Sequence, residues 1–243
     1  MAKIDLKKSA GFSLILENNE LTSTDFVPKT MLVADIEDVR NQLLNQDLSY
    51  PETFYNKYLS LDQDNILDQK GLRLNTYVIP SNLAGIEYVK TRANRLKTHP
   101  KILEVLYGGG VIILQRYTED GNTDVILTKI KRDQKIIVPP DFAMVLVNTR
   151  QSTLVVSEIY QKDLRHSASL DEMKGMNYYV IRKNAKQEIV RNPNYRDDSK
   201  YRRVKWEDLA TKHSITLRTP IIKQILRKYE KFSWLFKENS PEI

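Results

Sequence analysis

Apolar and polar residues alternate with a period of two through the middle of the chain, from residue 72 to residue 160. This period is typical of β-strands that bury one face. Short runs rich in glycine, proline, asparagine and aspartate separate the apolar segments and mark turns. The predicted strands cover residues 72–79, 85–91, 102–107, 111–117, 125–130, 135–138, 144–148 and 153–160. Many short strands broken by turns favour an antiparallel sandwich or barrel over a parallel sheet.

The segments on either side of this region follow other patterns. Residues 1–30 alternate short apolar and polar groups, which predicts an extended arm or an edge strand. Four apolar residues then recur at three- and four-residue steps and predict a helix: Leu32, Ile36, Val39 and Leu43. Near the end of the chain, Thr219 can cap a second helix whose first position is Pro220.

These patterns divide the chain into three parts. We expect an arm and a helix over residues 1–50, a barrel over residues 51–192, and an extension with a basic amphipathic helix over residues 193–243. A helix with one apolar side usually packs on its own barrel or on a second subunit. Binding of this helix to a membrane surface or to a partner is the less favoured alternative.

The composition restricts the kinds of site and the compartment. The 243 residues include no cysteine, so disulfides and thiolate metal sites are excluded and only Asp, Glu and His remain as metal ligands. His99, His166 and His213 lie too far apart in sequence to suggest a local cluster. No apolar run resembles a signal peptide or a membrane span, so we expect a cytoplasmic protein.

The formal charge of +7 favours anionic partners in general. The basic residues are spread along the chain without the aromatic and glycine signature of an RNA-binding sheet. We therefore interpret them as a solvated surface, and expect neither a nucleic-acid nor a membrane partner.

Three stretches carry a resemblance to a known family. They are residues 89–96, which read VKTRANRL, residues 100–108, which read PKILEVLYG, and residues 138–144, which read VPPDFAM. Over residues 29–192 the chain resembles the cupin-type glucose-6-phosphate isomerases of archaea and some bacteria. The resemblance implies a mainly β fold, a cupin barrel of the double-stranded β-helix or jelly-roll type, here with N-terminal and C-terminal helical extensions. Cupins commonly pair through their sheets, so it also implies a homodimer.

The metal site that the resemblance implies has lost its ligands. Where the family has three histidines and one glutamate, this chain has Asn94, Leu96, Lys101 and Met144. Leucine and methionine do not replace a hard ligand, and the ammonium group of a lysine repels a cation. We therefore expect no metal or other cofactor.

Other positions of the family's pocket are kept. By the resemblance, a hexose phosphate would be bound by Tyr55, Thr76, Thr91, Tyr160 and His166, and Glu87 matches a glutamate of the family's preceding strand. The phosphate side of the pocket is thus retained while the metal side is lost.

Interconversion of an aldose phosphate and a ketose phosphate requires a positioned base and a group that stabilises the developing oxyanion. Lys101 is a candidate for the positive charge that the metal would supply, with Glu87, Glu158 or His166 as the base. Alternatively, a glutamate that faces Lys101 forms a buried ion pair with a structural role only.

Three functions follow from these alternatives. The first is a metal-free cupin that binds a sugar phosphate and has weak or lost isomerase activity. The second is an isomerase or epimerase that works without the usual metal. The third is a structural or assembly protein whose C-terminal helix binds a partner.

Overall fold

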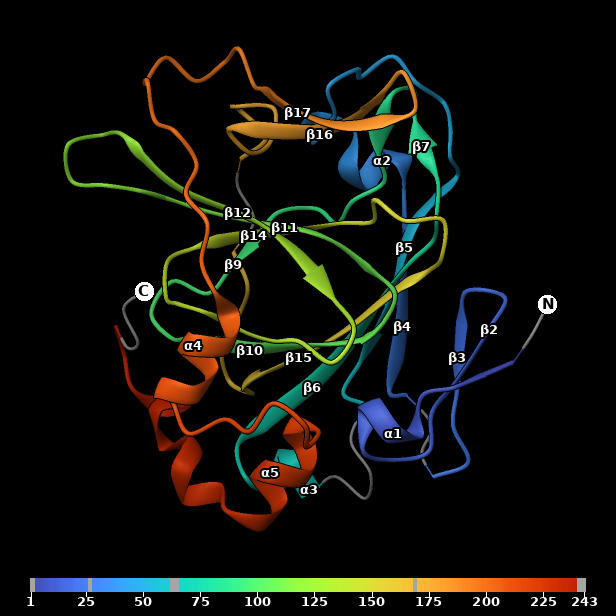
Figure 1. Cartoon of the computed structure of the whole chain (residues 1–243), viewed down its shortest axis with the longest axis vertical. Helices are drawn as coiled ribbons and strands as arrows, with labels where there is room; N and C mark the ends of the chain where they lie inside the picture. The colour runs from blue at the N-terminus through green and yellow to red at the C-terminus, as the bar shows by residue number, and fades with distance from the viewer. Residues whose placement is uncertain (1–2, 26–27, 62–65, 168–169, 240–243) are drawn as a thin grey trace.

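A computed structural model of the chain shows two large antiparallel β-sheets that face each other and form the core of the fold (Figure 1). The structure describes residues 3–25, 28–61, 66–167 and 170–239. The strands of these sheets are β4 (Thr30–Asp35), β5 (Thr53–Leu59), β6 (Leu72–Ile79), β9 (Asn94–Arg95), β10 (Lys101–Tyr107), β11 (Gly109–Tyr117), β12 (Thr123–Lys131), β13 (Lys135–Val138), β14 (Ala143–Val147) and β15 (Leu154–Gln161). The six-stranded sheet has the order β13-β10-β15-β6-β5-β4, and the four-stranded sheet has the order β12-β11-β14-β9.

The chain passes back and forth between the two sheets. Strands β10, β13 and β15 lie in the six-stranded sheet, whereas β11, β12 and β14 lie in the four-stranded sheet. This crossing is the jelly-roll arrangement, and it confirms the mainly β fold predicted from the alternation. Gly108 makes the turn between β10 and β11 with a φ of 73°, and a Cβ atom there would lie 2.2 Å from the carbonyl oxygen of Thr153. Only glycine fits this turn.

The helix predicted around Leu32 is wrong in its first part. Residues 30–35 form β4, which pairs with β5. Helix α2 (Ile36–Val39) begins only after Asp35, whose side chain accepts hydrogen bonds from the backbone N–H groups of Glu37 and Asp38. A single turn of 3-10 helix, η1 (Arg40–Gln42), follows it. The capping box at Asp35 therefore fixes the helix start, and the spacing of apolar residues before it is coincidental.

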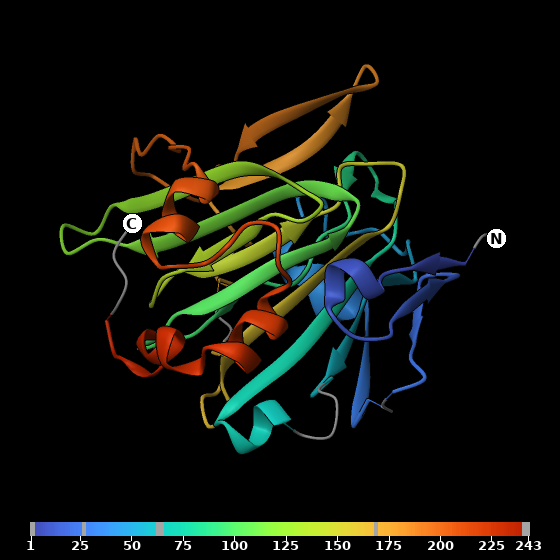
Figure 2. The same cartoon turned by 60° about the horizontal axis from the view of Figure 1, so that its bottom comes forward.

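The outer face of the six-stranded sheet is covered by both ends of the chain (Figure 2). The N-terminal arm forms a small sheet of β1 (Ile4–Asp5), β2 (Ile15–Glu17) and β3 (Glu20–Thr22), with α1 (Lys7–Ala10) packed on β10. The C-terminal helices are α4 (Trp206–Lys212), α5 (Ile221–Arg227) and the 3-10 helix η3 (Tyr229–Phe236), and the short α3 (Ile66–Gln69) packs on β6. Since η3 contacts β15 and α4 contacts β13, the C-terminal extension packs on its own barrel.

The outer face of the four-stranded sheet is covered by a second small sheet. This sheet contains β7 (Leu83–Ala84), β8 (Glu87–Tyr88), β16 (Tyr178–Lys183) and β17 (Lys186–Arg191). The predicted strand over residues 85–91 is therefore only the two-residue β8. An apolar cluster that includes Val111, Ile113, Val145 and Val180 lies between the two sheets. Within the described residues, no helix is long and apolar enough to cross a membrane.

Candidate functional site

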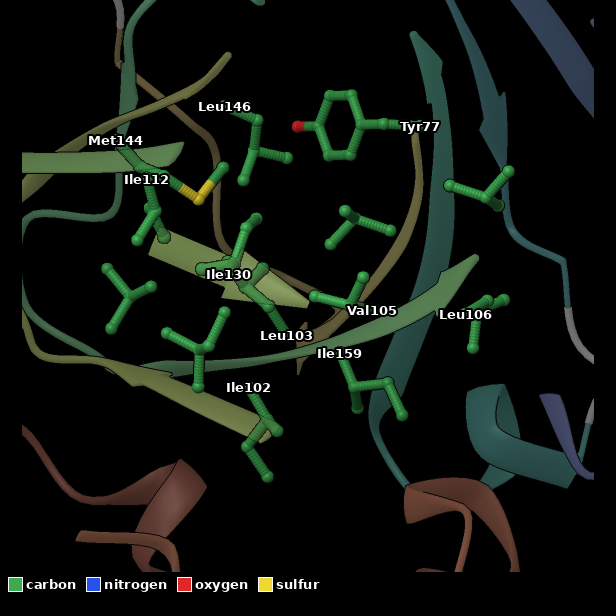
Figure 3. Packing of buried hydrophobic residues seen from close by; sticks show 14 of the residues in the cluster. Tyr77, Ile102, Leu103, Val105, Leu106, Ile112, Ile130, Met144, Leu146 and Ile159 are labelled. Carbon is green, nitrogen blue, oxygen red and sulfur yellow. The ribbon is translucent and has the colours of Figure 1, made fainter. Parts of the chain in front are cut away.

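The interior between the two sheets is apolar on one side. Figure 3 shows Leu103 and Val105 of β10 packed near Ile112 of β11 and Met144 and Leu146 of β14. All five side chains are buried. This half of the interior is filled with aliphatic groups, so polar chemistry is restricted to the other half.

The polar half is centred on Glu158 of β15. Its side chain is fully buried, and Oε1 lies 2.9 Å from Nζ of Lys57 on β5. Oε1 also accepts hydrogen bonds from Nδ2 of Asn75 at 3.1 Å and from the hydroxyl of Tyr77 at 3.0 Å. Strand alternation explains the grouping, because Glu158 pairs with Asn75 across β15 and β6, and Lys57 pairs with Tyr77 across β5 and β6.

The second carboxylate oxygen of Glu158 faces another set of groups. Oε2 lies 3.5 Å from Nζ of Lys101 and 3.8 Å from Nε2 of His166. His166 packs edge-on against the ring of Tyr160, with 4.7 Å between ring centroids. The Tyr160 hydroxyl accepts a hydrogen bond from Asn75 at 3.1 Å. Lys57, Asn75, Tyr77, Lys101, Glu158, Tyr160 and His166 thus form one connected group, called the Glu158 cluster below.

The positions expected to have lost metal ligands lie beside this cluster. Asn94 pairs with Met144 across β9 and β14, and its Oδ1 accepts a hydrogen bond from Nζ of Lys101 at 2.5 Å. Leu96 is buried two residues further along the chain. An amide, an ammonium group, a thioether and an aliphatic side chain do not match the donor set of a divalent metal. Within the described residues, no group of three or more His, Asp or Glu side chains is arranged to hold a metal.

The charge states within the cluster are set by burial and by the two lysines. Burial opposes ionisation of Glu158, but the ammonium groups of Lys57 and Lys101 outweigh it and hold the pKa of Glu158 well below its usual range. Burial lowers the pKa of Lys101 to about 8 against the attraction of Glu158. Burial also lowers the pKa of His166 to about 3. At neutral pH the carboxylate and Lys101 are therefore charged, and His166 is neutral.

The cluster carries more positive than negative charge. Lys57 and Lys101 both lie against the single carboxylate of Glu158, and Arg73 of β6 lies beside Tyr160. Most of these side chains are inaccessible, but those of Lys57 and His166 keep 14% and 17% of their surface exposed. Tyr55 and Asn94 are also partly exposed. The surplus positive charge is therefore buried for the most part and reaches solvent through Lys57 and His166.

The other residues predicted for the site are placed differently. Tyr55 lies 5.9 Å from Tyr77 between ring centroids, at the edge of the cluster. Thr76 points to the opposite face of β6, because it pairs with Ser157 and Tyr58 rather than with Glu158. Thr91 is buried, and its hydroxyl accepts the backbone N–H of Leu146 at 3.0 Å.

Glu87 lies outside the cluster as well. It forms a buried ion pair with Lys90 and accepts the backbone N–H of Leu44 at 2.8 Å. Lys90 also donates to the carbonyl oxygen of Gln42 at 2.6 Å. Glu87 thus ties the segment after α2 to the barrel. The structure brings Lys101, Glu158 and His166 together but keeps Glu87 apart from them.

Four members of the site were not predicted from the sequence: Lys57, Arg73, Asn75 and Tyr77. A signal for them exists in the alternation, since Lys57 lies two residues after Tyr55 on β5. Similarly, Arg73, Asn75 and Tyr77 alternate along β6 and share the inward face. The pairing of β5 with β6 was needed to recognise the signal.

Comparison with solved structures finds chains of low similarity. A cupin 2 conserved barrel domain protein from Rhodopseudomonas palustris is 10% identical, with 62% of this chain and 88% of that chain covered and a TM-score of 0.38. A 7S globulin from Momordica charantia is 12% identical, with 51% and 35% covered and a TM-score of 0.38. Pumpkin seed globulin is 13% identical, with 58% and 35% covered and a TM-score of 0.39. The chain thus spans about a third of the length of these globulins.

No curated protein matches the chain. The family model described as glucose-6-phosphate isomerase (GPI) matches residues 29–197, close to the range expected from the sequence. Since this match covers well over half of the 243 residues, the chain belongs to the cupin-type glucose-6-phosphate isomerase family.

Proposed function

We propose that this protein binds a hexose phosphate without a metal and has weak or lost isomerase activity. The observation that carries the proposal is the surplus of positive charge in the Glu158 cluster, where two ammonium groups share one carboxylate. A phosphate ester would add the missing negative charge at the partly exposed end, within reach of Lys57 and His166. Tyr55 and Tyr160 add hydroxyl groups at the same end.

The lowered pKa values of the groups available for proton transfer support the proposal of weak or lost isomerase activity. Glu158 is held ionised by its cations, and a carboxylate with a strongly lowered pKa is a poor base. The lowered pKa of His166, about 3, makes this residue a poor base as well. Lys101 retains its charge at neutral pH and can stabilise an oxyanion. Binding and electrostatic stabilisation are thus kept, whereas proton abstraction is slow.

Calorimetry with fructose 6-phosphate and 6-phosphogluconate tests the proposal. Lys57→Met removes a charged hydrogen-bond donor worth about 1.5–3 kcal/mol, so affinity falls by about 10-fold to 100-fold. Lys135→Met is the matched control, since it removes a buried lysine from the outer face of the same sheet. Affinity within twofold of the wild type is expected for the control. Absence of saturable heat with either sugar phosphate rejects the proposal.

A metal-independent isomerase is the second candidate, and the position of Lys101 favours it. The ammonium group lies 3.5 Å from Glu158, among the residues that replace the family's ligands. A coupled isomerase assay before and after chelation, with and without added iron, manganese or nickel, tests this function. Turnover that survives chelation and disappears in Lys101→Ala supports it. No turnover under any condition eliminates it.

We also propose that the protein forms a homodimer through β4. This strand is the edge of the six-stranded sheet, and its residues Met31, Leu32 and Val33 are 44%, 49% and 50% exposed. An exposed apolar edge strand is a template on which another chain can pair, and a second copy of the same strand can pair with it symmetrically. Leu32→Lys is expected to give a monomer in sedimentation analysis, whereas the control Leu226→Lys, at an exposed apolar position on α5, leaves the dimer intact. A wild-type monomer at every concentration contradicts this arrangement.

A further inference from the structure

The segment beyond the family match carries most of the net charge of the chain. Residues 198–243 contain 11 Lys and Arg against 6 Asp and Glu, a net charge of +5. Residues 1–197 contain 27 against 25, a net charge of +2. The positive charge is therefore not spread evenly along the chain, as the sequence alone suggested, but belongs mainly to the C-terminal extension.

A pocket of 220 Å³ lies within this extension, between α5, the start of η3 and the loop before α5. The loop contributes the hydroxyl-bearing residues Ser214, Thr216 and Thr219. Three basic residues line the same pocket: Arg227, Lys228 and Lys231. Hydroxyl groups and cations thus line one volume.

The wall of the pocket is held in place by Gln224. Its Nε2 donates to the carbonyl oxygens of Thr216 at 2.8 Å and Thr219 at 2.6 Å, and its Oε1 accepts the backbone N–H of Thr216 at 2.8 Å. These bonds join the loop to α5 through one side chain. The buried ring of Phe232 also lines the pocket. The loop and α5, which carry the donors, are therefore held together before any ligand arrives, and this lowers the entropic cost of binding.

The electrostatics of the pocket favour an oxyanion. No carboxylate lines it, and within the described part of the chain none of the three basic side chains forms an ion pair. Ammonium, guanidinium and hydroxyl groups together are the donors that proteins use for phosphate. The volume is below the roughly 300–1,000 Å³ typical of sites for drug-sized ligands, so a small anion fits better.

We infer that this pocket is a second anion site that binds a small phosphate-type oxyanion. It lies in the C-terminal extension, whereas the Glu158 cluster lies between the two sheets. The inference is therefore independent of sugar-phosphate binding in the barrel.

Titration calorimetry with diphosphate, at a fixed salt concentration near the physiological one, tests the inference. The double variant Lys228→Gln/Lys231→Gln is expected to bind diphosphate at least tenfold more weakly than the wild type. Lys212→Gln/Lys223→Gln is the matched control, because it removes the same charge from exposed lysines of the same extension that do not line the pocket. The control should bind within twofold of the wild type. Lys57→Met should also bind normally, which separates this site from the barrel.

Other outcomes overturn the inference. If the wild type shows no saturable diphosphate binding, and thermal unfolding shows that the protein is folded, the inference of a second anion site is wrong. Equal weakening in both double variants means that only net charge matters. A single-stranded oligonucleotide that binds much more tightly than diphosphate, and that weakens equally in the two double variants, points to a nucleic-acid surface instead of this pocket.

Discussion

Strand β10 carries a buried lysine–glutamate pair on each of its two faces, and the pairs differ in how many cations meet each carboxylate. On the inner face, Lys101 shares Glu158 with Lys57. On the outer face, Glu104 lies 3.0 Å from Lys135, its one ion-pair partner among the described residues, and accepts the backbone N–H of Ile221 at 2.9 Å. Burial raises the pKa of Glu104 to about 7 against the attraction of Lys135, whereas the pKa of Glu158 stays well below its usual range.

This difference separates a structural pair from a candidate site. In the outer pair, Lys135 also donates to the carbonyl oxygens of Asp133 at 2.9 Å and Leu217 at 2.6 Å, and the C-terminal segment covers the pair. Once Glu104 is ionised, its single negative charge balances the single positive charge of Lys135. The inner face has two lysine cations for one carboxylate, and the side chains of Lys57 and His166 are partly exposed there. The surplus cation, more than burial or pairing, is the reason why we propose the inner face as the place for an anionic ligand.

The largest difference between the two pairs is expected when each carboxylate is removed. Glu158→Gln leaves two ammonium groups buried without a counter-charge, which costs about 3–5 kcal/mol of unfolding free energy. Glu104→Gln leaves one lysine that keeps two carbonyl acceptors, and costs about 1–3 kcal/mol. Urea unfolding followed by the fluorescence of Trp206 and Trp234 measures both.

The control for this prediction is Glu158→Gln combined with Lys101→Met. Removal of one of the two unpaired cations should recover part of the lost unfolding free energy. A purely steric defect would not show this recovery. Equal losses for the two single variants, with no recovery in the double variant, would mean that the surplus charge on the inner face has no energetic effect.

The second largest effect is a pH dependence of the unfolding free energy. The raised pKa of Glu104, about 7, predicts it between pH 4.5 and 7, where Glu158 makes no such contribution. The folded protein keeps the proton on Glu104 between pH 4.5 and 7, while the unfolded chain releases it. The stabilisation by this group is therefore complete below pH 4.5 and is lost as pH rises toward 7, by at most about 3 kcal/mol. Glu158, with its lowered pKa, loses stabilisation only when pH falls below 4.5.

The contribution of His166 to the unfolding free energy changes in the opposite direction in part of this window. Because burial lowers its pKa to about 3, the unfolded chain takes up the proton of His166 at a higher pH than the folded protein does. The measurement is therefore the difference in unfolding free energy between the wild type and Glu104→Gln at several pH values. That difference should change between pH 4.5 and 7 and be constant above it. A difference that is constant throughout contradicts the raised pKa.

The comparison also shows what the sequence could predict. The alternation in β10 places Lys101 and Glu104 on opposite faces, and a buried ion pair between Lys101 and a glutamate that faces it was among the alternatives. The ion pair of Lys101 and Glu158 is found, but its surplus cation was missed. Lys57 is on β5, which lies in the six-stranded sheet only because of its long-range pairing with β6. No local pattern gives that register.

The outer pair was missed for a similar reason. Neither Glu104 nor Lys135 was among the residues predicted for a site. Both are buried because the segment before α5 lies across them, more than 80 residues later in the chain. Sequence alternation tells which face of a strand a residue occupies, but not what covers that face.

The smallest effect is expected from removal of one lysine from each pair. Lys101→Met should cost less than about 1 kcal/mol, because Lys57 still neutralises Glu158 and the methionine side chain fills a similar volume. Lys135→Met should cost about 1–3 kcal/mol, because Glu104 keeps only the N–H of Ile221. Urea unfolding of both variants at pH 8 measures the difference. If Lys101→Met is as costly as Lys135→Met, then Glu158 needs both cations, no positive charge is left over for a ligand, and the reason for assigning phosphate binding to the inner face disappears.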